Sequence, residues 1–340
     1  MESQATAKSA QAPLFIAAGV SHWDAARKLR ENIVFTPERT LALRRALEAA
    51  GIDGCMVLST CNRSEIFLCA KEASISSVAP AFSNVFPGVD IENVFTLRRG
   101  AEAIEYLFRV ASGIESMVFG EYQILGQVRA ACAEAREAGG VVGPLDRILR
   151  DAVSCARLVR NKLDLGAVAP SVCSVAMDCA DKLGALAGKR VFVIGSGRTG
   201  TLAAEIAVRC GAKQLFVCNR SPERAQHLVD GFGAKIVPYD ERYLVLGQCD
   251  TVVSATASPH TVISSERVKL ERPVVFVDLA LPRDIDPEIS SNPFAQIIDL
   301  DSIGAFARGD TNERTSLEAR ADEIVKAAVA ETMAILEARR

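Results

Sequence analysis

The sequence has few histidines and no cysteine pair at the spacing of a zinc or redox motif. Its three histidines stand far apart, at positions 22, 227 and 260, and its ten cysteines include no Cys-x-x-Cys. A metal site built from clustered cysteine or histidine ligands is therefore not expected. An apolar secretion signal is also missing from the N-terminal residues, so we expect reduced thiols in the cytoplasm rather than a disulfide framework.

Long apolar runs and a strong charge of one sign are missing as well. No apolar stretch reaches membrane-spanning length, and 39 basic against 42 acidic residues give a net charge of −3. A protein coated with nucleic-acid contacts would be basic, so any RNA contact must come from a local patch. With 49% apolar and 24% charged residues in a chain of 340, we expect a globular protein of two or three domains.

The first feature that is present is a cysteine in a polar turn. A hydrophobic run leads into Ser59–Arg63, after which apolar residues resume. This pattern predicts a strand, a tight loop and a second strand or helix. Thr60 and Asn62 would then be donors beside the Cys61 thiol, and Arg63 would stabilise its thiolate, which is the nucleophilic form. The alternative is that Cys61 is a small buried residue near a strand end.

A glycine-rich turn is the second feature. An apolar strand ends at Ile194 and is followed by Gly195-Ser-Gly-Arg-Thr-Gly200, and a helical pattern begins at Thr201. In this context backbone N–H groups and the helix N-terminus face the pyrophosphate of a dinucleotide. The next strand, Gln214–Cys218, ends in Asn219-Arg-Ser221, where an NAD site would carry an acidic residue. A guanidinium there suits a 2′-phosphate, so NADPH is the predicted cofactor.

The remaining patterns define the expected organisation. Strands and helices alternate over 189–300, which predicts a doubly wound sheet, and one long amphipathic helix is expected from Asn312 to Ala338. The pattern from Gln127 to Lys162 predicts a helix, and Leu163–Pro170 a linker. The expected fold is therefore α/β and multidomain, with a loose tail at 1–12, an α+β catalytic domain at 13–163, a Rossmann NADP-binding domain at 164–310 and a helical region at 311–340.

Two motifs carry a resemblance to a known family. The stretch Ser59–Arg63 resembles the active-site signature of glutamyl-tRNA reductases, and so does Gly113–Gln127, almost residue for residue. The resemblance covers roughly residues 14–335. It implies a cytoplasmic oxidoreductase that uses NADPH to reduce glutamyl-tRNA to glutamate-1-semialdehyde, the first step of C5 tetrapyrrole (porphyrin) biosynthesis. The reaction would pass through a thioester intermediate on the cysteine.

The resemblance also implies roles for individual residues. Cys61 would be the nucleophile, and Arg63 would bind the substrate carboxylate. The rest of the substrate pocket would be formed by Thr60, Asn62, Ser116, Glu121, Tyr122, Gln123 and Gln127. The cofactor would be bound by Gly195, Ser196, Gly197, Arg198, Thr199, Gly200, Asn219, Arg220 and Ser221. The expected partners are glutamyl-tRNA and the glutamate-1-semialdehyde aminomutase; neither a metal nor a membrane is expected.

Two departures from the family pattern leave alternatives open. Tyr106 stands where the family has a catalytic histidine, and a phenol is a hydrogen-bond donor rather than a ready proton carrier near neutral pH. The comparison with the family pattern leads us to expect that most of the family's helical dimerisation domain is absent, which leaves the oligomeric state open. The alternatives are a paralogue that reduces another activated acyl donor, a non-catalytic tRNA- or partner-binding relative, and an NADP dehydrogenase acting on a free small molecule. The region around Arg220 also resembles shikimate dehydrogenase.

Overall fold

The structure is a computed structural model that describes residues 13–90, 93–141, 143–165, 171–307 and 312–338. The residues expected as a tail, 1–12, and most of the expected linker, 166–170, lie outside the described residues. Contacts divide the chain into two compact units. Unit 1 comprises Met1–Ser116, Gln123–Ala167 and Ser316–Arg340, and unit 2 comprises Met117–Tyr122 and Val168–Thr315. The long C-terminal helix thus groups mainly with unit 1, and a six-residue segment of the 113–127 motif groups with unit 2.

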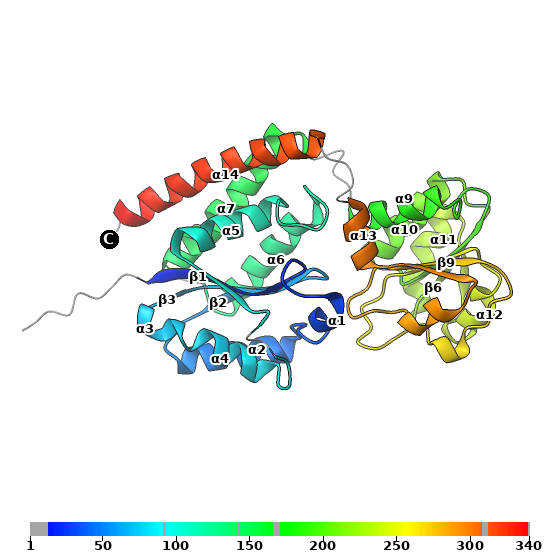
Figure 1. Cartoon of the computed structure of the whole chain (residues 1–340), viewed down its shortest axis with the longest axis horizontal. Coiled ribbons are helices and arrows are strands. Elements are labelled where there is room, and N and C mark those ends of the chain that lie inside the picture. The colour runs from blue at the N-terminus through cyan, green and yellow to red at the C-terminus, as the bar shows by residue number, and fades with distance from the viewer. Residues whose placement is uncertain (1–12, 91–92, 142, 166–170, 308–311, 339–340) are drawn as a thin grey trace, which may run out of the picture. The chain divides into compact units, whose positions relative to one another are not determined.

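Unit 1 is built on a four-stranded antiparallel sheet in the order β2-β3-β1-β4 (Figure 1). The strands are β1 (Leu14–Ser21), β2 (Cys55–Ser59), β3 (Arg63–Ala70) and β4 (Thr96–Arg99). Helices α1 (Arg27–Arg30), α2 (Pro37–Ala49), α3 (Glu72–Ile75) and α4 (Val78–Val85) lie on one side of this sheet in Figure 1. Helices α5 (Gly100–Ser112), α6 (Gln123–Glu137) and α7 (Gly143–Lys162) lie on the other. Apolar residues of β1 and β3 alternate between these two layers, which produces a core on each face.

Local signals explain where several of these helices begin and end. Thr36 caps α2 by accepting a hydrogen bond from the Arg39 N–H at 3.3 Å, and Pro37 follows at the first helical position. Gly113 ends α5 in the left-handed conformation, with φ of 80°. The helical pattern expected from Gln127 to Lys162 is present but divided into two helices, because α6 ends at Glu137 and a turn with Gly139 at φ of 72° precedes α7.

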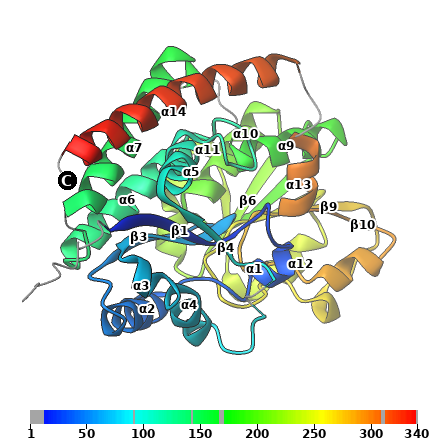
Figure 2. The ribbon, with the colours of Figure 1, turned by 60° about the vertical axis from the view of Figure 1, so that its left-hand side comes forward.

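Helix α14 (Asn312–Ala338) runs beside α7 in both Figure 1 and Figure 2. Its polar residues bind the two helices that it covers. Asp322 forms an ion pair with Arg109 of α5, and the Thr332 hydroxyl donates to Asp151 of α7 at 3.1 Å. No helix among the described residues combines the length and the apolar character needed to cross a membrane.

Unit 2 contains a six-stranded parallel sheet in the order β10-β9-β8-β5-β6-β7. Its strands are β5 (Arg190–Ile194), β6 (Gln214–Cys218), β7 (Lys235–Val237), β8 (Thr251–Ser254), β9 (Val274–Asp278) and β10 (Ala295–Ile298). Its α-helices are α9 (Val172–Lys182), α10 (Arg198–Arg209), α11 (Gln226–Phe232), α12 (Arg242–Leu246) and α13 (Leu300–Ala307). Short 3-10 helices cover Pro222–Ala225, Tyr239–Glu241, Ser265–Arg267 and Pro287–Ser291.

The strand order of unit 2 reverses direction at β5. Chain order runs from β5 to β7 toward one edge of the sheet and from β8 to β10 toward the other, which is the doubly wound topology. Ligands bind such sheets at the carboxyl ends of the strands beside the reversal. The predicted fold class, with an α+β part, a Rossmann sheet and a long C-terminal helix, is confirmed, whereas the predicted domain boundaries stay a prediction.

Candidate active site

Cys61 lies in the turn that joins β2 to β3. The Thr60 N–H donates to the Arg63 carbonyl at 2.8 Å, which closes the turn. The Asn62 N–H donates to the Thr60 hydroxyl oxygen at 3.1 Å. The cysteine itself is partly exposed. The predicted loop therefore exists, and its shape is set by backbone contacts and by Thr60.

Two residues from the segment after β1 form hydrogen bonds with the main chain of this loop. Arg30 is buried, and its Nη1 donates to the Cys61 carbonyl at 2.7 Å. The His22 N–H donates to the Asn62 carbonyl at 2.8 Å. Both contacts are accepted by carbonyl groups of the loop, so they do not involve the side chains of Cys61 and Asn62.

The other cysteines are poor candidates for a nucleophile. Burial raises the pKa of Cys55, Cys132, Cys155 and Cys218 to about 11 and that of Cys69, Cys173 and Cys249 to about 12. Burial also raises the pKa of Cys179 and of Cys210. A thiol that stays protonated near neutral pH attacks carbonyl groups slowly. Cys61 differs from these residues in its place on a partly exposed, polar loop.

A buried cluster of Arg63, Glu65 and Tyr106 follows directly from the loop into the core. Arg63 Nη1 lies 3.2 Å from each carboxylate oxygen of Glu65 and donates to the Tyr106 oxygen at 3.1 Å. Arg63 Nη2 donates to the Glu115 carbonyl, and the Tyr106 hydroxyl donates to Glu65 Oε1. All three side chains of the cluster are less than 10% exposed. The structure thus brings together two of the predicted site residues, Arg63 and Tyr106, by a direct hydrogen bond and by the Glu65 carboxylate, which was not predicted.

The charges of this cluster are mutually dependent. Burial is the largest single influence on Arg63 and lowers its pKa, but Glu65, Tyr106 and Glu115 together outweigh it, so the pKa is raised and the guanidinium stays charged. Burial, and next the charge of Glu65, raise the pKa of Tyr106 far above its ordinary value. The phenol therefore remains protonated near neutral pH and acts as a hydrogen-bond donor rather than as a proton carrier.

Glu65 is the site residue that the sequence interpretation missed. A carboxylate within the otherwise apolar run after Ser64 was the available signal, since such a charge is stable in a strand only when it is paired. Strand β1 passes close to Glu65 at Gly19, which has no side chain. Gly19 has φ of 146°, and a Cβ there would overlap the Ser64 carbonyl and lie 2.6 Å from the Glu65 Cα.

The remaining predicted substrate residues are divided between the two units. Ser116, Gln123 and Gln127 belong to unit 1, whereas Glu121 and Tyr122 belong to unit 2. Gln127 lines a cavity of about 520 Å³ together with Ser59, two residues before Cys61. Asn62 is 5% exposed, and its Oδ1 has no hydrogen-bond partner among the described residues. A buried acceptor left in this way is available to a donor on a ligand.

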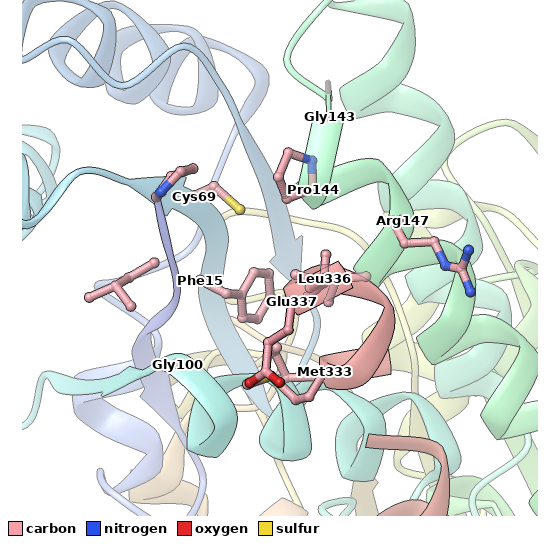
Figure 3. Close-up of a pocket in the computed structure, with 13 residues that line it drawn as sticks. Phe15, Cys69, Gly100, Gly143, Pro144, Arg147, Met333, Leu336 and Glu337 are labelled. Atoms are coloured by element: carbon pink, nitrogen blue, oxygen red, sulfur yellow. The ribbon is translucent and has the colours of Figure 1, made fainter. Parts of the chain in front are cut away.

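A second cavity in unit 1 lies apart from these residues. Figure 3 shows this space, of about 450 Å³, with Phe15, Met333, Leu336, Arg147 and Glu337 among its lining residues. None of the predicted site residues lines it. Its only sulfur nucleophile is Cys69, whose pKa burial raises to about 12.

The glycine-rich turn of unit 2 has the geometry of a dinucleotide site. Gly195 has φ of 100°, and a Cβ there would overlap the Ala255 carbonyl; a Cβ on Gly200 would overlap the Gly195 carbonyl. A Cβ on Gly197, in contrast, would meet no protein atom within 4 Å. Gly197 is also the N-cap of α10, which has no side-chain cap. Two glycines therefore allow the turn to close, and the third leaves the N–H groups of the helix open to a phosphate.

The loop after β6 adds a positive charge to this edge of the sheet. Asn219 Nδ2 donates to the Ser221 carbonyl at 2.9 Å and shapes the loop. Arg220 Nη2 lies 3.1 Å from the Ser258 hydroxyl oxygen, and its guanidinium lies 5.8 Å from the centre of the Tyr239 ring. No acidic residue stands at positions 219–221. The residues present here fit a nucleotide that carries an extra phosphate. Among the described residues, no group of three or more histidine, cysteine and acidic side chains could hold a metal ion.

A partly exposed thiol on a braced loop and an open glycine turn on a doubly wound sheet define a nucleotide-dependent oxidoreductase. Comparisons with known proteins agree. Residues 18–163 match the family described as the N-terminal domain of glutamyl-tRNA(Glu) reductase, and residues 178–305 match the shikimate/quinate 5-dehydrogenase family. Pyridine-nucleotide binding by unit 2 is consistent with the second match.

Individual relatives establish the family of the whole chain. The chain is 37% identical over 298 residues to glutamyl-tRNA reductase of Desulfotalea psychrophila, covering 84% of this chain and 69% of that protein. It is 35% identical over 322 residues to that of Myxococcus xanthus, covering 92% and 71%. The solved glutamyl-tRNA reductase of Methanopyrus kandleri superposes with a TM-score of 0.54 at 29% identity, covering 95% of this chain and 80% of that one. The protein belongs to the glutamyl-tRNA reductase family, which confirms the resemblance of its motifs.

Proposed function

We propose that the protein reduces the glutamyl group of glutamyl-tRNA to glutamate-1-semialdehyde with NADPH, through a thioester on Cys61. The observation that carries this proposal is the Cys61 loop. Its main chain is held by Arg30 and by the segment at His22. Cys61 is partly exposed, as are Cys69, Cys179 and Cys210, but it differs from them in lying on this polar turn. Holding a nucleophile in one geometry lowers the entropic cost of its attack.

The covalent step uses an acyl group that is already activated. The Cys61 thiolate attacks the ester carbonyl, the carbon–sulfur bond forms, and the ester oxygen leaves with the tRNA and takes up a proton. NADPH, when bound, supplies the hydride that reduces the thioester to the aldehyde and releases the thiolate. The residues of the glycine turn, Gly195–Gly200, would bind its pyrophosphate, and Arg220 would bind its 2′-phosphate.

Asn62 and the buried cluster have separate proposed roles. The Oδ1 of Asn62, which has no partner among the described residues, would accept a hydrogen bond from the substrate. The ammonium group of the glutamyl unit is a suitable donor for this bond. Tyr106 would hold Glu65 as a donor. Binding of the substrate carboxylate by Arg63 stays a prediction, and it requires Arg63 to exchange one of its present acceptors, such as the Glu115 carbonyl.

The other predicted contacts also stay proposals. Thr60, Ser116, Glu121, Gln123 and Gln127 would complete the substrate pocket. The preference for NADPH over NADH rests on the charge of Arg220 and on the absence of a carboxylate beside it in the sequence. Transfer of the aldehyde to the aminomutase and a cytoplasmic location are expectations of the same proposal.

The test is to trap the acyl enzyme. The protein is incubated with glutamyl-tRNA, and Cys61 is examined by mass spectrometry before and after NADPH is added. We expect a glutamyl adduct on Cys61 that disappears with NADPH, no adduct in Cys61→Ser, and a normal adduct in the matched variant Cys69→Ser. Absence of an adduct with every charged tRNA tested would contradict the proposal.

The dehydrogenase match of residues 178–305 supports a second candidate, namely oxidation or reduction of a free small molecule without a covalent step. The same variants separate the two. Under the second candidate Cys61→Ser keeps most of its turnover, whereas under the first it loses on the order of a thousandfold or more, as is usual when a nucleophile is removed.

A further inference from the structure

The segment Met117–Tyr122 is anchored on unit 2 although the residues on both sides of it belong to unit 1. Met117 is 5% exposed and packs on α13, where a Cβ on Gly304 would lie 3.3 Å from the Met117 sulfur. Val118 and Phe119 are buried as well. The segment is therefore fixed against the nucleotide-binding unit, and it ends in Tyr122.

Tyr122 contacts the glycine-rich turn through an arginine. The guanidinium carbon of Arg198 lies 5.0 Å from the centre of the Tyr122 ring. Arg198 is the first residue of α10 and directly follows Gly197. Within the described part of the chain the structure gives Arg198 no ion pair, and its side chain is exposed. The Tyr122 ring is thus a neighbour that this charge contacts.

The position of Arg198 is unfavourable without an anion. The N-terminal end of a helix carries a partial positive charge, so an arginine in the first turn is repelled by it. A phosphate bound at the same end reverses this balance, because it attracts both the helix N-terminus and the guanidinium. A Cβ on Gly197 would meet no protein atom within 4 Å, so no protein atom blocks the approach of a phosphate at this point.

We propose that Tyr122 is a positioning residue that holds Arg198 for the pyrophosphate of the dinucleotide. This inference rests on the proposed nucleotide site. A guanidinium can stack with its flat face on an aromatic ring while its edge donates to a phosphate, so both contacts can exist at once. The ring thereby limits the conformations of the free Arg198 side chain, so less conformational entropy is lost when the nucleotide binds.

The test measures dissociation constants of NADPH and NADH directly, by nucleotide fluorescence, at low ionic strength. Tyr122→Leu removes the ring and is expected to weaken both nucleotides by about two- to fivefold, the size of an exposed cation–π contact. Tyr122→Phe keeps the ring face and is expected to bind as the unchanged protein does. Because the pyrophosphate is common to both nucleotides, the loss should be equal for the two.

Two arginine variants complete the design. Arg198→Met should weaken both nucleotides by about tenfold or more, and Tyr122→Leu should have no further effect once Arg198 is gone. Arg220→Met is the matched control, since removing it should weaken NADPH and spare NADH. Circular dichroism of each variant checks that the fold is retained.

The inference is overturned if Tyr122→Leu has the same effect with and without Arg198, or if Tyr122→Phe loses as much affinity as Tyr122→Leu. Either result would make Tyr122 a structural contact only, and the nucleotide site would stand. If the unchanged protein binds neither nucleotide, the proposed cofactor and this inference both fail.

Discussion

The Cys61 loop and the glycine-rich turn both follow a buried strand, yet they are stabilised in opposite ways. The Cys61 loop is next to a buried ion pair of Arg63 and Glu65 and the neutral phenol of Tyr106. The glycine turn requires residues without a Cβ, because Gly195 and Gly200 each pass close to a neighbouring carbonyl group. The first should be sensitive to the loss of a charge and the second to the gain of a methyl group.

The largest effect should come from breaking the buried ion pair. Glu65→Gln leaves the Arg63 guanidinium, whose side chain is 1% exposed, without its negative partner. We expect a loss of about 3 to 5 kcal/mol in the free energy of unfolding, which is typical of an uncompensated buried charge. Urea unfolding followed by circular dichroism measures it.

The chain offers a matched control for this variant. Arg99 and Glu72 form an ion pair at 3.2 Å, the same separation as Arg63 and Glu65, but both side chains are about half exposed. Water already screens this pair, so Glu72→Gln should cost only about 0 to 1 kcal/mol. Similar losses in the two variants would show that burial does not govern the Arg63 cluster.

The next effect should come from adding a methyl group to the glycine turn. A Cβ in Gly200→Ala would overlap the Gly195 carbonyl, so the turn must shift. We expect a loss of about 1 to 3 kcal/mol in stability, as in other overpacked sites, together with weaker nucleotide binding. Thermal unfolding and nucleotide titration measure the two effects.

Gly197→Ala is the counterpart within the same turn. Its Cβ would meet no protein atom within 4 Å, and its φ of −74° is accessible to alanine. Stability should change by less than about 0.5 kcal/mol, while the nucleotide, which approaches this backbone, should bind more weakly. A destabilisation equal to that of Gly200→Ala would refute the comparison of the two glycines.

A smaller effect is expected from removing one hydrogen bond of the cluster. Tyr106→Phe takes away the donor to the Glu65 carboxylate and should cost about 1 to 2 kcal/mol at neutral pH. Because folding raises the pKa of Tyr106, its contribution is complete below the ordinary value of 10.0 and declines as the pH rises above it.

The pH dependence is the decisive part of this measurement. The stability difference between the unchanged protein and Tyr106→Phe should be constant from about pH 7 to about pH 9 and shrink above about pH 10. A difference that instead shrinks on acidification would contradict control of this contribution by the phenol.

The sequence alone predicted the features that depend on near neighbours. The polar turn at Cys61 and the glycine spacing of Gly195–Gly200 are recognisable because strand, turn and helix preferences act over a few residues. Glu65 was missed because its partner Tyr106 is 41 residues away in the chain. The break in the helical pattern from Gln127 to Lys162 was not predicted for a related reason, since the turn at Gly139 and Gly140 brings Gly140 against Gly54.

Periodicity and composition thus predicted the fold class and the place of the thiol, and the resemblance of two short motifs pointed to the family, because each of these features is contained in short stretches of residues. Tertiary structure alone decided what the polar side chains do. It engaged Arg63 with Glu65, turned Tyr106 into a permanent donor, and grouped Tyr122 with Arg198. These outcomes follow from burial and from contacts between residues far apart in the chain, where desolvation sets the strength of each charge and hydrogen bond.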